Sequence, residues 1–186
     1  VSATEIVIGA TATLTQVAEN AAIRKAAPAV AEAAGKSATP LVRNRGTVGG
    51  NLGQRPRCWY FRHPEYQCLK NGATGCFAHE GENKYHAIFD NQTCAIVHPS
   101  NLAPALMIHD AEVRVRGPKS DRRVAVADLY AAPESSPTRE LTLAEDELIV
   151  SVHVPAGSGS ASGSVYHEVR EKQSFDWALV SSAARV

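Results

Sequence analysis

The spacing of apolar residues changes period within the first forty residues. EIVIGATATLT, residues 5–15, is rich in β-branched residues around Gly9 and predicts one or two short strands. Over residues 15–36 the apolar positions, mostly alanine, follow helical spacing and end near Gly35. Pro28 should divide that segment into two helices, because a proline inside a helix removes a hydrogen bond and clashes with the preceding turn.

Regular patterns return at residue 98, after a long irregular stretch. HPSNLAPALMIHDAEVRVRG predicts a turn at Pro99-Ser100, a short helix over 101–109 and a strand at 111–116. Two later segments, VAVADLY and ELIVSVHVP, predict two more strands, or a strand and a helix, with the polar stretch 133–142 between them. The last segment, SVYHEVREKQSFDWALVSSAARV, starts with a strand-like pattern and continues with a helical one.

The irregular stretch over residues 43–98 contains all four cysteines. Loops of this length are usually functional, so we interpret it as a functional loop or insertion rather than as core. GSGSASGS, residues 157–164, is typical of a flexible linker or a hairpin tip. The overall prediction is an α+β fold in which a small second domain begins near residue 160.

The composition excludes several classes of function. Hydrophobic residues make up 44% of the chain and charged residues 20%, which is ordinary for a globular protein. The formal net charge of +0 leaves no overall field that would attract nucleic acid or anionic membranes. No apolar run approaches the roughly 18 residues of a membrane-spanning helix, and the first residues lack a signal-peptide pattern. Without paired carboxylates or a Ser-His-Asp order, we name no catalytic residue.

GTVGGN, residues 46–51, places two adjacent glycines between a hydroxyl residue, Thr47, and an amide residue, Asn51. Glycine allows positive φ and has no Cβ, so a ligand can lie against exposed backbone N–H groups. The side chains of Thr47 and Asn51 add hydrogen-bonding groups for phosphate, ribose or ring edges. The spacing matches neither the dinucleotide fingerprint nor the Walker loop. The other interpretation is a tight turn that uses Gly-Gly for its geometry alone.

The four cysteines are separated by nine, seven and seventeen residues, and they are Cys58, Cys68, Cys76 and Cys94. Four thiolates can bind zinc or an iron–sulfur cluster, or form two disulfides. None of the gaps is the short knuckle of structural zinc sites, and a chain of this size does not need disulfides to hold its core. Iron–sulfur ligation tolerates long gaps, because the cluster itself organises the loop.

Basic residues surround the first two cysteines. Between residues 43 and 70 the acidic residue Glu65 stands against Arg43, Arg45, Arg55, Arg57, Arg62 and Lys70. Such a surround would stabilise an anionic tetrathiolate cluster and raise its reduction potential. Three histidines of the same loop could replace a cysteine as ligand, or be ordinary polar loop residues: His63, His79 and His86.

Two of these motifs together resemble a known family. RNRGTVGGNL, followed later by HPSNLAPAL, resembles the flavin-binding medium subunit, or middle domain, of the xanthine dehydrogenase family of molybdenum hydroxylases. In that family an R-N-x-[AG]-T-[VI]-G-G-N-[LI] stretch binds FAD, and a later P-S-D-L turn also contacts it. YHEVREKQSFDWALVSSA resembles the opening of the C-terminal domain of the family's flavin subunit. The resemblance covers about residues 5–186.

The segment between the motifs resembles one branch of the family, similar to bacterial periplasmic aldehyde oxidoreductase. It contains CWYFR, GENKYHAIF and the four cysteines, and the flavin subunit of that branch carries an additional [4Fe–4S] cluster. The resemblance implies that this cluster is bound by Cys58, Cys68, Cys76 and Cys94. It also implies that FAD is contacted by Thr47, Val48, Gly49, Gly50, Asn51, Ser100 and Asn101.

The resemblance further implies an organisation into domains. The expected fold is α+β, the second part of a two-subdomain FAD-binding (PCMH-type) fold that is truncated at both ends. We expect a partial FAD-binding domain over 1–155 with the cysteine insertion at 54–97, a linker or hairpin at 156–164, and the start of the C-terminal domain at 165–186. The family's first, glycine-rich flavin loop should precede this chain, so these 186 residues alone should bind FAD weakly or not at all.

Two positions depart from the family's pattern. The family usually has aspartate where this chain has Asn101, and an amide keeps one acceptor but loses the negative charge. A lysine that is common in the tail segment aligns with Glu168. These departures put any flavin contact made through the family's aspartate and lysine in question.

In this family a molybdenum cofactor on a large partner subunit hydroxylates an aldehyde or N-heterocycle. Electrons then pass through [2Fe–2S] clusters on a small partner subunit to FAD, and onward to an external acceptor. The resemblance therefore implies a flavin electron-transfer subunit of a heterotrimer, and it leaves the compartment open between the bacterial cytoplasm and the periplasm. From the net charge and the apolar runs we expect neither nucleic-acid binding nor membrane insertion. Two other hypotheses are a zinc- or partner-binding module without redox activity and an inactive truncated fragment.

Overall fold

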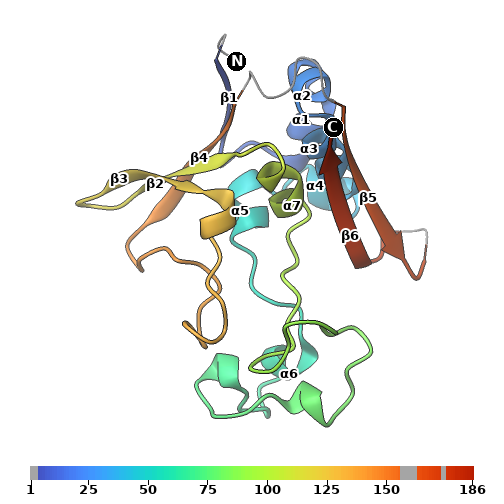
Figure 1. Cartoon of the computed structure of the whole chain (residues 1–186), viewed down its shortest axis with the longest axis vertical. Helices are drawn as coiled ribbons and strands as arrows, with labels where there is room; N and C mark the ends of the chain where they lie inside the picture. Colours follow the sequence, from blue (N-terminus) through green and yellow to red (C-terminus); the bar gives the residue numbers. More distant parts are fainter. Residues whose placement is uncertain (1–3, 156–162, 173–174) are drawn as a thin grey trace. The chain divides into compact units, whose positions relative to one another are not determined.

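The computed structural model of the chain describes residues 4–155, 163–172 and 175–186. They form two compact units, each built from segments that are distant in the sequence. The first unit comprises Val1–Leu52, Ser100–Leu129 and Leu143–Val186, and the second comprises Gly53–Pro99 and Tyr130–Thr142. Figure 1 labels the elements of both units.

An antiparallel four-stranded sheet with the order β1-β4-β2-β3 organises the first unit. Its strands are β1 (Glu5–Gly9), β2 (Glu112–Arg116), β3 (Asp121–Ala125) and β4 (Leu148–Pro155). Val152 of β4 lies opposite Ile8 of β1 on one side and Val113 of β2 on the other. All three side chains are buried, and each burial contributes about 1.5–3 kcal/mol. The register thus joins the N-terminal strand to two later strands in one core.

Three short helices follow β1, where the sequence pattern predicts two. They are α1 (Leu14–Glu19), α2 (Ala21–Ala26) and α3 (Pro28–Lys36). Pro28 is the first residue of α3, so the predicted break at this proline is confirmed. A second break occurs at Asn20, whose side chain accepts hydrogen bonds from the backbone N–H groups of Ala22 and Ile23. Asparagine favours the cap over the helix interior, and this local competition is invisible to apolar periodicity.

The predicted helix over 101–109 and the predicted strand at 111–116 are confirmed as α7 (Leu102–Met107) and β2. Shorter helical segments of the first unit are α4 (Pro40–Arg43), α5 (Val48–Leu52) and a 3₁₀ turn at Val126–Asp128. Among the described residues, no helix has both the length and the apolar character needed to cross a membrane.

The last described segments form a two-stranded antiparallel sheet. β5 (Ser164–Arg170) pairs with β6 (Ala178–Arg185), so that Val169 lies opposite Val180. The helical pattern predicted for the end of the chain is therefore wrong at β6. Pairing with β5 outweighs the weak helical preference of the alanines in this strand. One face of β5 packs on α3 and buries Tyr166 completely. The predicted linker at 156–164 falls mostly outside the described residues.

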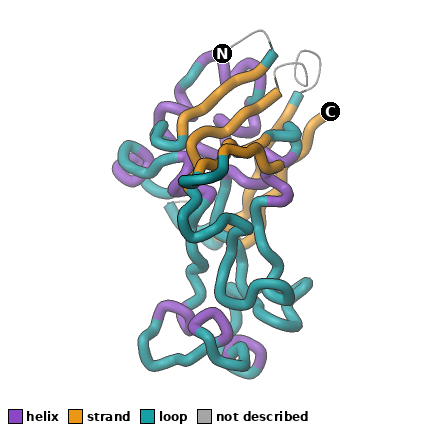
Figure 2. The backbone as a smooth tube through the Cα atoms, turned by 90° about the vertical axis from the view of Figure 1, so that its left-hand side faces the viewer, coloured by secondary structure: helices purple, strands orange, loops and turns teal. Residues whose placement is uncertain are grey.

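Loops make up most of the second unit (Figure 2). Its helical segments are α6 (Trp59–Arg62) and the 3₁₀ turns η1 (Leu69–Asn71) and η2 (Phe77–His79). Tyr60, Ala78 and Ala95 form a small buried cluster, against which Cys58 and Cys76 pack. Because so few apolar side chains are buried there, this unit has little hydrophobic stabilisation of its own.

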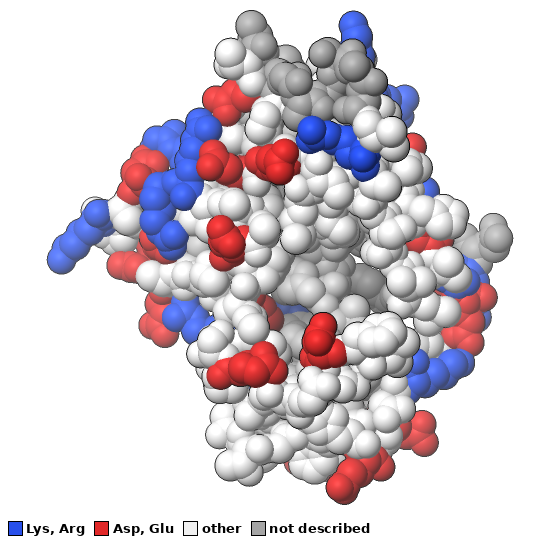
Figure 3. Space-filling view, in the orientation of Figure 1, with Lys and Arg blue, Asp and Glu red and all other residues white. Residues whose placement is uncertain are grey.

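Charged side chains of both signs lie close together over β2 and β3 of the first unit (Figure 3). Arg114 and Arg116 both pair with Asp121, and Arg122 pairs with Glu147. Each of these arginines therefore has a carboxylate partner within its own unit.

Candidate functional site

The glycine stretch predicted to contact a ligand forms the start of a helix. α5 begins at Val48, and the carbonyl oxygen of Thr47 accepts the N–H of Asn51 at 2.8 Å. The hydroxyl of Thr47 accepts the N–H of Gly50 at 3.2 Å, as an N-cap side chain does. Thr47 therefore caps a short helical turn at the position where the alternative interpretation placed a tight turn.

Gly49 is required by close packing rather than by positive φ. Gly72 is the one glycine with positive φ in the part of the chain that the structure describes. A Cβ at Gly49 would lie 3.0 Å from the Cβ and 3.2 Å from the carbonyl oxygen of Ala10. The N–H of Gly49 donates to Ala10 at 2.8 Å, and that of Val48 donates to Ala12 at 2.9 Å. The expectation that these two N–H groups are exposed to a ligand is therefore wrong.

The two predicted flavin motifs meet in a buried joint between α5 and α7. Ser100 Oγ donates to Asn51 Oδ1 at 2.7 Å, and the N–H of Leu102 donates to the same oxygen at 3.3 Å. Ser100 Oγ also accepts the N–H of Ala103 at 3.1 Å, at the start of α7. Asn51 and Ser100 are 7% and 6% exposed. One amide oxygen thus fixes the position of the second motif relative to the first.

The two departures from the family's pattern are in contact with each other. Asn101 Nδ2 donates to Glu168 Oε2 at 3.2 Å and to the hydroxyl oxygen of Tyr166 at 3.0 Å. The Tyr166 hydroxyl donates to Glu168 Oε2 at 3.1 Å, and Arg170 pairs with the same carboxylate. Burial raises the pKa of Tyr166, which keeps its hydroxyl a donor. An aspartate at position 101 would repel Glu168, so the amide and the carboxylate are mutually consistent.

A basic pocket of about 370 Å³ lies beside Glu168 in the first unit. Its charged lining residues are Lys36, Arg43, Glu168, Arg170 and Lys172. Lys36 Nζ donates to the Tyr166 carbonyl at 2.8 Å, and Arg43 Nη1 donates to the Ala38 carbonyl at 2.7 Å. The pocket lining thus has four cationic side chains and one carboxylate, and this excess of positive charge favours binding of an anionic group. Sequence reasoning missed this pocket because α3 and β5 come together from positions about 130 residues apart.

All four cysteines line one pocket of the second unit, together with Tyr60, Phe77, His86 and Ala95. Cys68 and Cys94 are buried and Cys58 and Cys76 are half-buried, and none of the four forms a disulfide. The structure therefore brings together the complete predicted ligand set, although its members span residues 58–94. In the described part of the chain, no three Cys, His, Asp or Glu side chains converge closely enough for a single metal ion.

The environment of the cysteines disfavours free thiolates. Burial raises the pKa of the Cys58 thiol and raises the pKa of the Cys94 thiol to about 11, and the neighbouring thiols add to both effects. These two side chains are therefore protonated at neutral pH unless a cationic centre binds them. Since the thiolate is the metal-binding form, such a centre would displace the protons.

Two of the six basic residues predicted to surround the cysteines form ion pairs with Glu140. Arg55 Nε lies 3.0 Å from Glu140 Oε2, and the buried Lys70 Nζ lies 3.6 Å from Glu140 Oε1. The expectation of an almost purely basic surround is therefore wrong. A carboxylate from a distant segment offsets part of the positive charge, and the local sequence window gives no sign of it.

His86 is the one of the three loop histidines that lines the cysteine pocket. Its Nε2 lies 3.2 Å from the Sγ of Cys58, and burial lowers the pKa of the ring, which keeps it neutral at pH 7. The other two make local contacts instead: His79 Nε2 donates to the Asn91 carbonyl at 2.7 Å, and His63 Nδ1 accepts the N–H of Glu65 at 3.3 Å.

Sequence comparison places these motifs in a family context. Residues 1–157 match the family model described as FAD binding domain in molybdopterin dehydrogenase. The aldehyde oxidoreductase FAD-binding subunit PaoB of Escherichia coli (strain K12) is 36% identical over 180 residues, which is 95% of this chain and 56% of PaoB. The xanthine dehydrogenase FAD-binding subunit of Escherichia coli O157:H7 is 24% identical over 177 residues, 95% of this chain and 45% of that subunit. The chain spans about half the length of these curated relatives.

Solved structures share the fold. A carbon monoxide dehydrogenase from Hydrogenophaga pseudoflava matches with a TM-score of 0.61 and 22% identity, over 96% of this chain and 45% of that chain. The reconstituted CO dehydrogenase from Oligotropha carboxidovorans matches with a TM-score of 0.66 and 19% identity, over 99% of this chain and 48% of that chain. Quinoline 2-oxidoreductase from Pseudomonas putida 86 matches with a TM-score of 0.64 and 19% identity, over 100% of this chain and 47% of that chain. The expected mixed α and β flavin-binding fold is confirmed.

Proposed function

This chain belongs to the family of FAD-binding domains of molybdopterin dehydrogenases, and from that premise we propose that it is the flavin electron-transfer part of a molybdenum-dependent oxidoreductase of the aldehyde or xanthine type. The observation that carries the proposal is the hydrogen bond from Ser100 to Asn51. It joins the two motifs that are expected to contact the flavin, within a domain of the matching fold.

The residues of this joint divide into two roles. Thr47, Gly50 and Asn101 are partly or fully exposed, and Val48, Asn51 and Ser100 are buried. We assign flavin contacts to the exposed group and positioning of the two motifs to the buried group. When bound, FAD would take up electrons and pass them to an acceptor, while the chain's residues hold and orient it.

The proposal includes a [4Fe–4S] cluster bound by the four cysteines. The donor set fits this group, because four thiols line one pocket and none of them forms a disulfide. In a four-iron cluster each thiolate binds a different iron. Thiols that are too widely spaced to bind one zinc ion can therefore still bind the four irons of such a cluster.

The proposed partners are a molybdenum-cofactor large subunit and a [2Fe–2S] small subunit, which together with this subunit form a heterotrimer. Electrons would reach the flavin from the [2Fe–2S] clusters of the small subunit. The substrate would be oxidised on the large subunit, since no residue of this chain is assigned to substrate chemistry.

The test is anaerobic purification of the complete subunit with its partners, followed by measurement of flavin absorbance, iron, sulfide and zinc. We expect FAD together with about four iron atoms for the cluster of this subunit. Cys76→Ser should remove at least half of that iron and leave the FAD content unchanged, because the two sites lie in different units. Thr93→Ser, next to Cys94, is the matched control and should retain all the iron.

The other outcomes separate the competing functions. Stoichiometric zinc without colour would favour a zinc-binding module, and protein without either cofactor would favour an inactive fragment. Unchanged iron in Cys76→Ser would show that Cys76 is not a ligand.

A further inference from the structure

We propose that His86 donates a hydrogen bond from Nε2 to the sulfur of Cys58 and thereby raises the reduction potential of the cluster. The inference rests on the [4Fe–4S] cluster of the proposed function and assigns a positioning and tuning role to a residue outside its ligand set. Its basis is the 3.2 Å separation of His86 Nε2 and Cys58 Sγ within the cysteine pocket.

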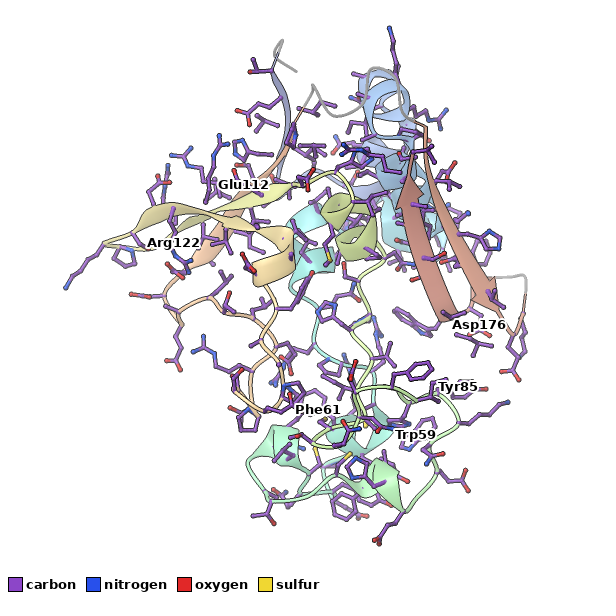
Figure 4. The ribbon with its side chains drawn as sticks, viewed as in Figure 1. Trp59, Phe61, Tyr85, Glu112, Arg122 and Asp176 are labelled. Carbon is purple, nitrogen blue, oxygen red and sulfur yellow. The ribbon has the colours of Figure 1, made fainter. Side chains whose placement is uncertain are left out.

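The imidazole ring of His86 is held in a fixed orientation. The backbone N–H of His86 donates to the Asn83 carbonyl at 2.9 Å. The ring stands edge-on to Trp59, with centroids 4.9 Å apart, and lies tilted 6.1 Å from Tyr60. Tyr85 also packs edge-on against Trp59 with a centroid distance of 6.0 Å, and Figure 4 shows these two rings in the second unit. Such packing directs Nε2 at the sulfur.

The other ring nitrogen identifies the tautomer. Nδ1 of His86 is buried, and the described residues provide it with no hydrogen-bond partner. A buried N–H without an acceptor costs the full desolvation of a strong donor, whereas an unused ring lone pair costs less. The proton of the neutral ring therefore resides on Nε2. Once Cys58 is an iron-bound thiolate it has no proton to give, so the imidazole is the donor of this contact.

A hydrogen bond to a ligating sulfur favours the state that carries more negative charge. Reduction adds one electron to the cluster and its thiolates, so an N–H directed at Cys58 stabilises the reduced form more than the oxidised form. Removing the donor should make the cluster harder to reduce without removing a ligand.

The experiment compares three variants of the complete subunit in its complex. His86→Leu removes the donor, and His86→Gln keeps an N–H close to the position of Nε2. His79→Gln changes a histidine of the same loop that bonds to the Asn91 carbonyl instead of to a cysteine. Each protein is analysed for iron and sulfide, and its cluster is titrated with a redox mediator while the reduced cluster is followed by electron paramagnetic resonance.

We expect His86→Leu to retain its iron and, at the midpoint potential of the unaltered protein, to show a roughly tenfold lower ratio of reduced to oxidised cluster. For a one-electron couple this equals a downward shift of about 59 mV. His86→Gln should recover most of the potential, and His79→Gln should match the unaltered protein. If His86→Leu loses iron through misfolding, a His86→Gln variant with full iron and near-normal potential still supports the assignment.

The opposing outcomes are distinguishable. Absence of iron and sulfide from the unaltered protein overturns the proposed cluster and, with it, the role of His86. Full iron with an unchanged potential in His86→Leu overturns the role of His86 and leaves the cluster standing. Loss of iron from both His86 variants, with His79→Gln intact, would make His86 a ligand and overturn the hydrogen-bond assignment.

Discussion

At the scale of single residues, a chain of hydrogen bonds links β1 to β4. Ser151 Oγ lies 2.9 Å from His153 Nε2, and His153 Nδ1 lies 2.9 Å from Glu5 Oε2. Arg123 of β3 pairs with both Glu5 and Glu112. The order serine, histidine, carboxylate resembles a nucleophile-activating triad. Because Ser151 is 7% exposed and lies within a paired strand, we interpret this series of hydrogen bonds as a structural link between β1 and β4.

This link predicts a dependence of stability on pH. Its contacts, the His153 hydrogen bond above all, lower the pKa of Glu5 below its ordinary value of 4.5. A lowered pKa in the folded state gives stabilisation that is present above the unfolded value and is lost as the pH falls through the folded value. We expect Glu5→Gln to lower the unfolding temperature at pH 7, by an amount that shrinks below pH 4.5.

Thermal unfolding of the unaltered and variant proteins between about pH 7 and pH 3 measures the effect. Glu145→Gln, at an exposed position, is the control and should change little. A difference between the Glu5 variant and the unaltered protein that stayed constant over the whole range would contradict the explanation.

At the scale of elements, two glycines within helices have opposite roles. Gly49 of α5 approaches Ala10 so closely that a Cβ would meet it at 3.0 Å. Gly35 of α3 leaves room for a Cβ, whose nearest neighbour, the Cβ of Ala18, would be at an ordinary 3.6 Å. Packing between elements, rather than helix propensity, therefore decides which of the two glycines is required.

The corresponding prediction is a pair of substitutions with opposite signs. Gly49→Ala should lower the free energy of unfolding by about 1–3 kcal/mol, because α5 must move away from the segment after β1. Gly35→Ala should raise it by about 0.5 kcal/mol, since alanine restricts the unfolded chain and fits the helix. Urea unfolding of both variants gives the two values. A stabilising Gly49→Ala would show that α5 does not pack as described.

At the scale of the whole molecule, the two units depend on different sources of stability. The first unit buries strand and helix side chains such as Val113, Val152 and Leu106. The second has a buried apolar cluster of Tyr60, Ala78 and Ala95 beside the cysteines. A unit with so small a core commonly needs a metal group or cross-links to fold.

Removal of the proposed [4Fe–4S] cluster should therefore loosen the second unit selectively. After anaerobic chelation we expect amides in residues 53–99 to exchange hydrogen at least tenfold faster, a change that corresponds to about 1.4 kcal/mol of lost local stability. Amides of β1 and β4 should keep their rates. Hydrogen-exchange mass spectrometry of the complete subunit before and after chelation provides the comparison. Equal acceleration in both units would show that the cluster stabilises the whole chain instead.

Local patterns predict much of the first unit, because several of its elements carry their own signal. β-branched residues mark β1, a proline marks the start of α3, and apolar spacing marks α7 and β2. The break at Asn20 and the strand β6 lack such a signal. A cap competes with a helix through one side chain, and β6 derives its conformation from pairing with β5.

The sequence by itself determined the membership of a family and predicted the two flavin motifs and the four cysteines as a ligand set, since each depends on short contiguous stretches or on residue type. Tertiary structure alone decided which of these groups meet. It joins Ser100 to Asn51, Asn101 to Glu168, Lys70 to Glu140 and His86 to Cys58. These partners lie 28 or more residues apart, and only the packing of a whole unit brings such side chains within hydrogen-bonding or ion-pairing distance.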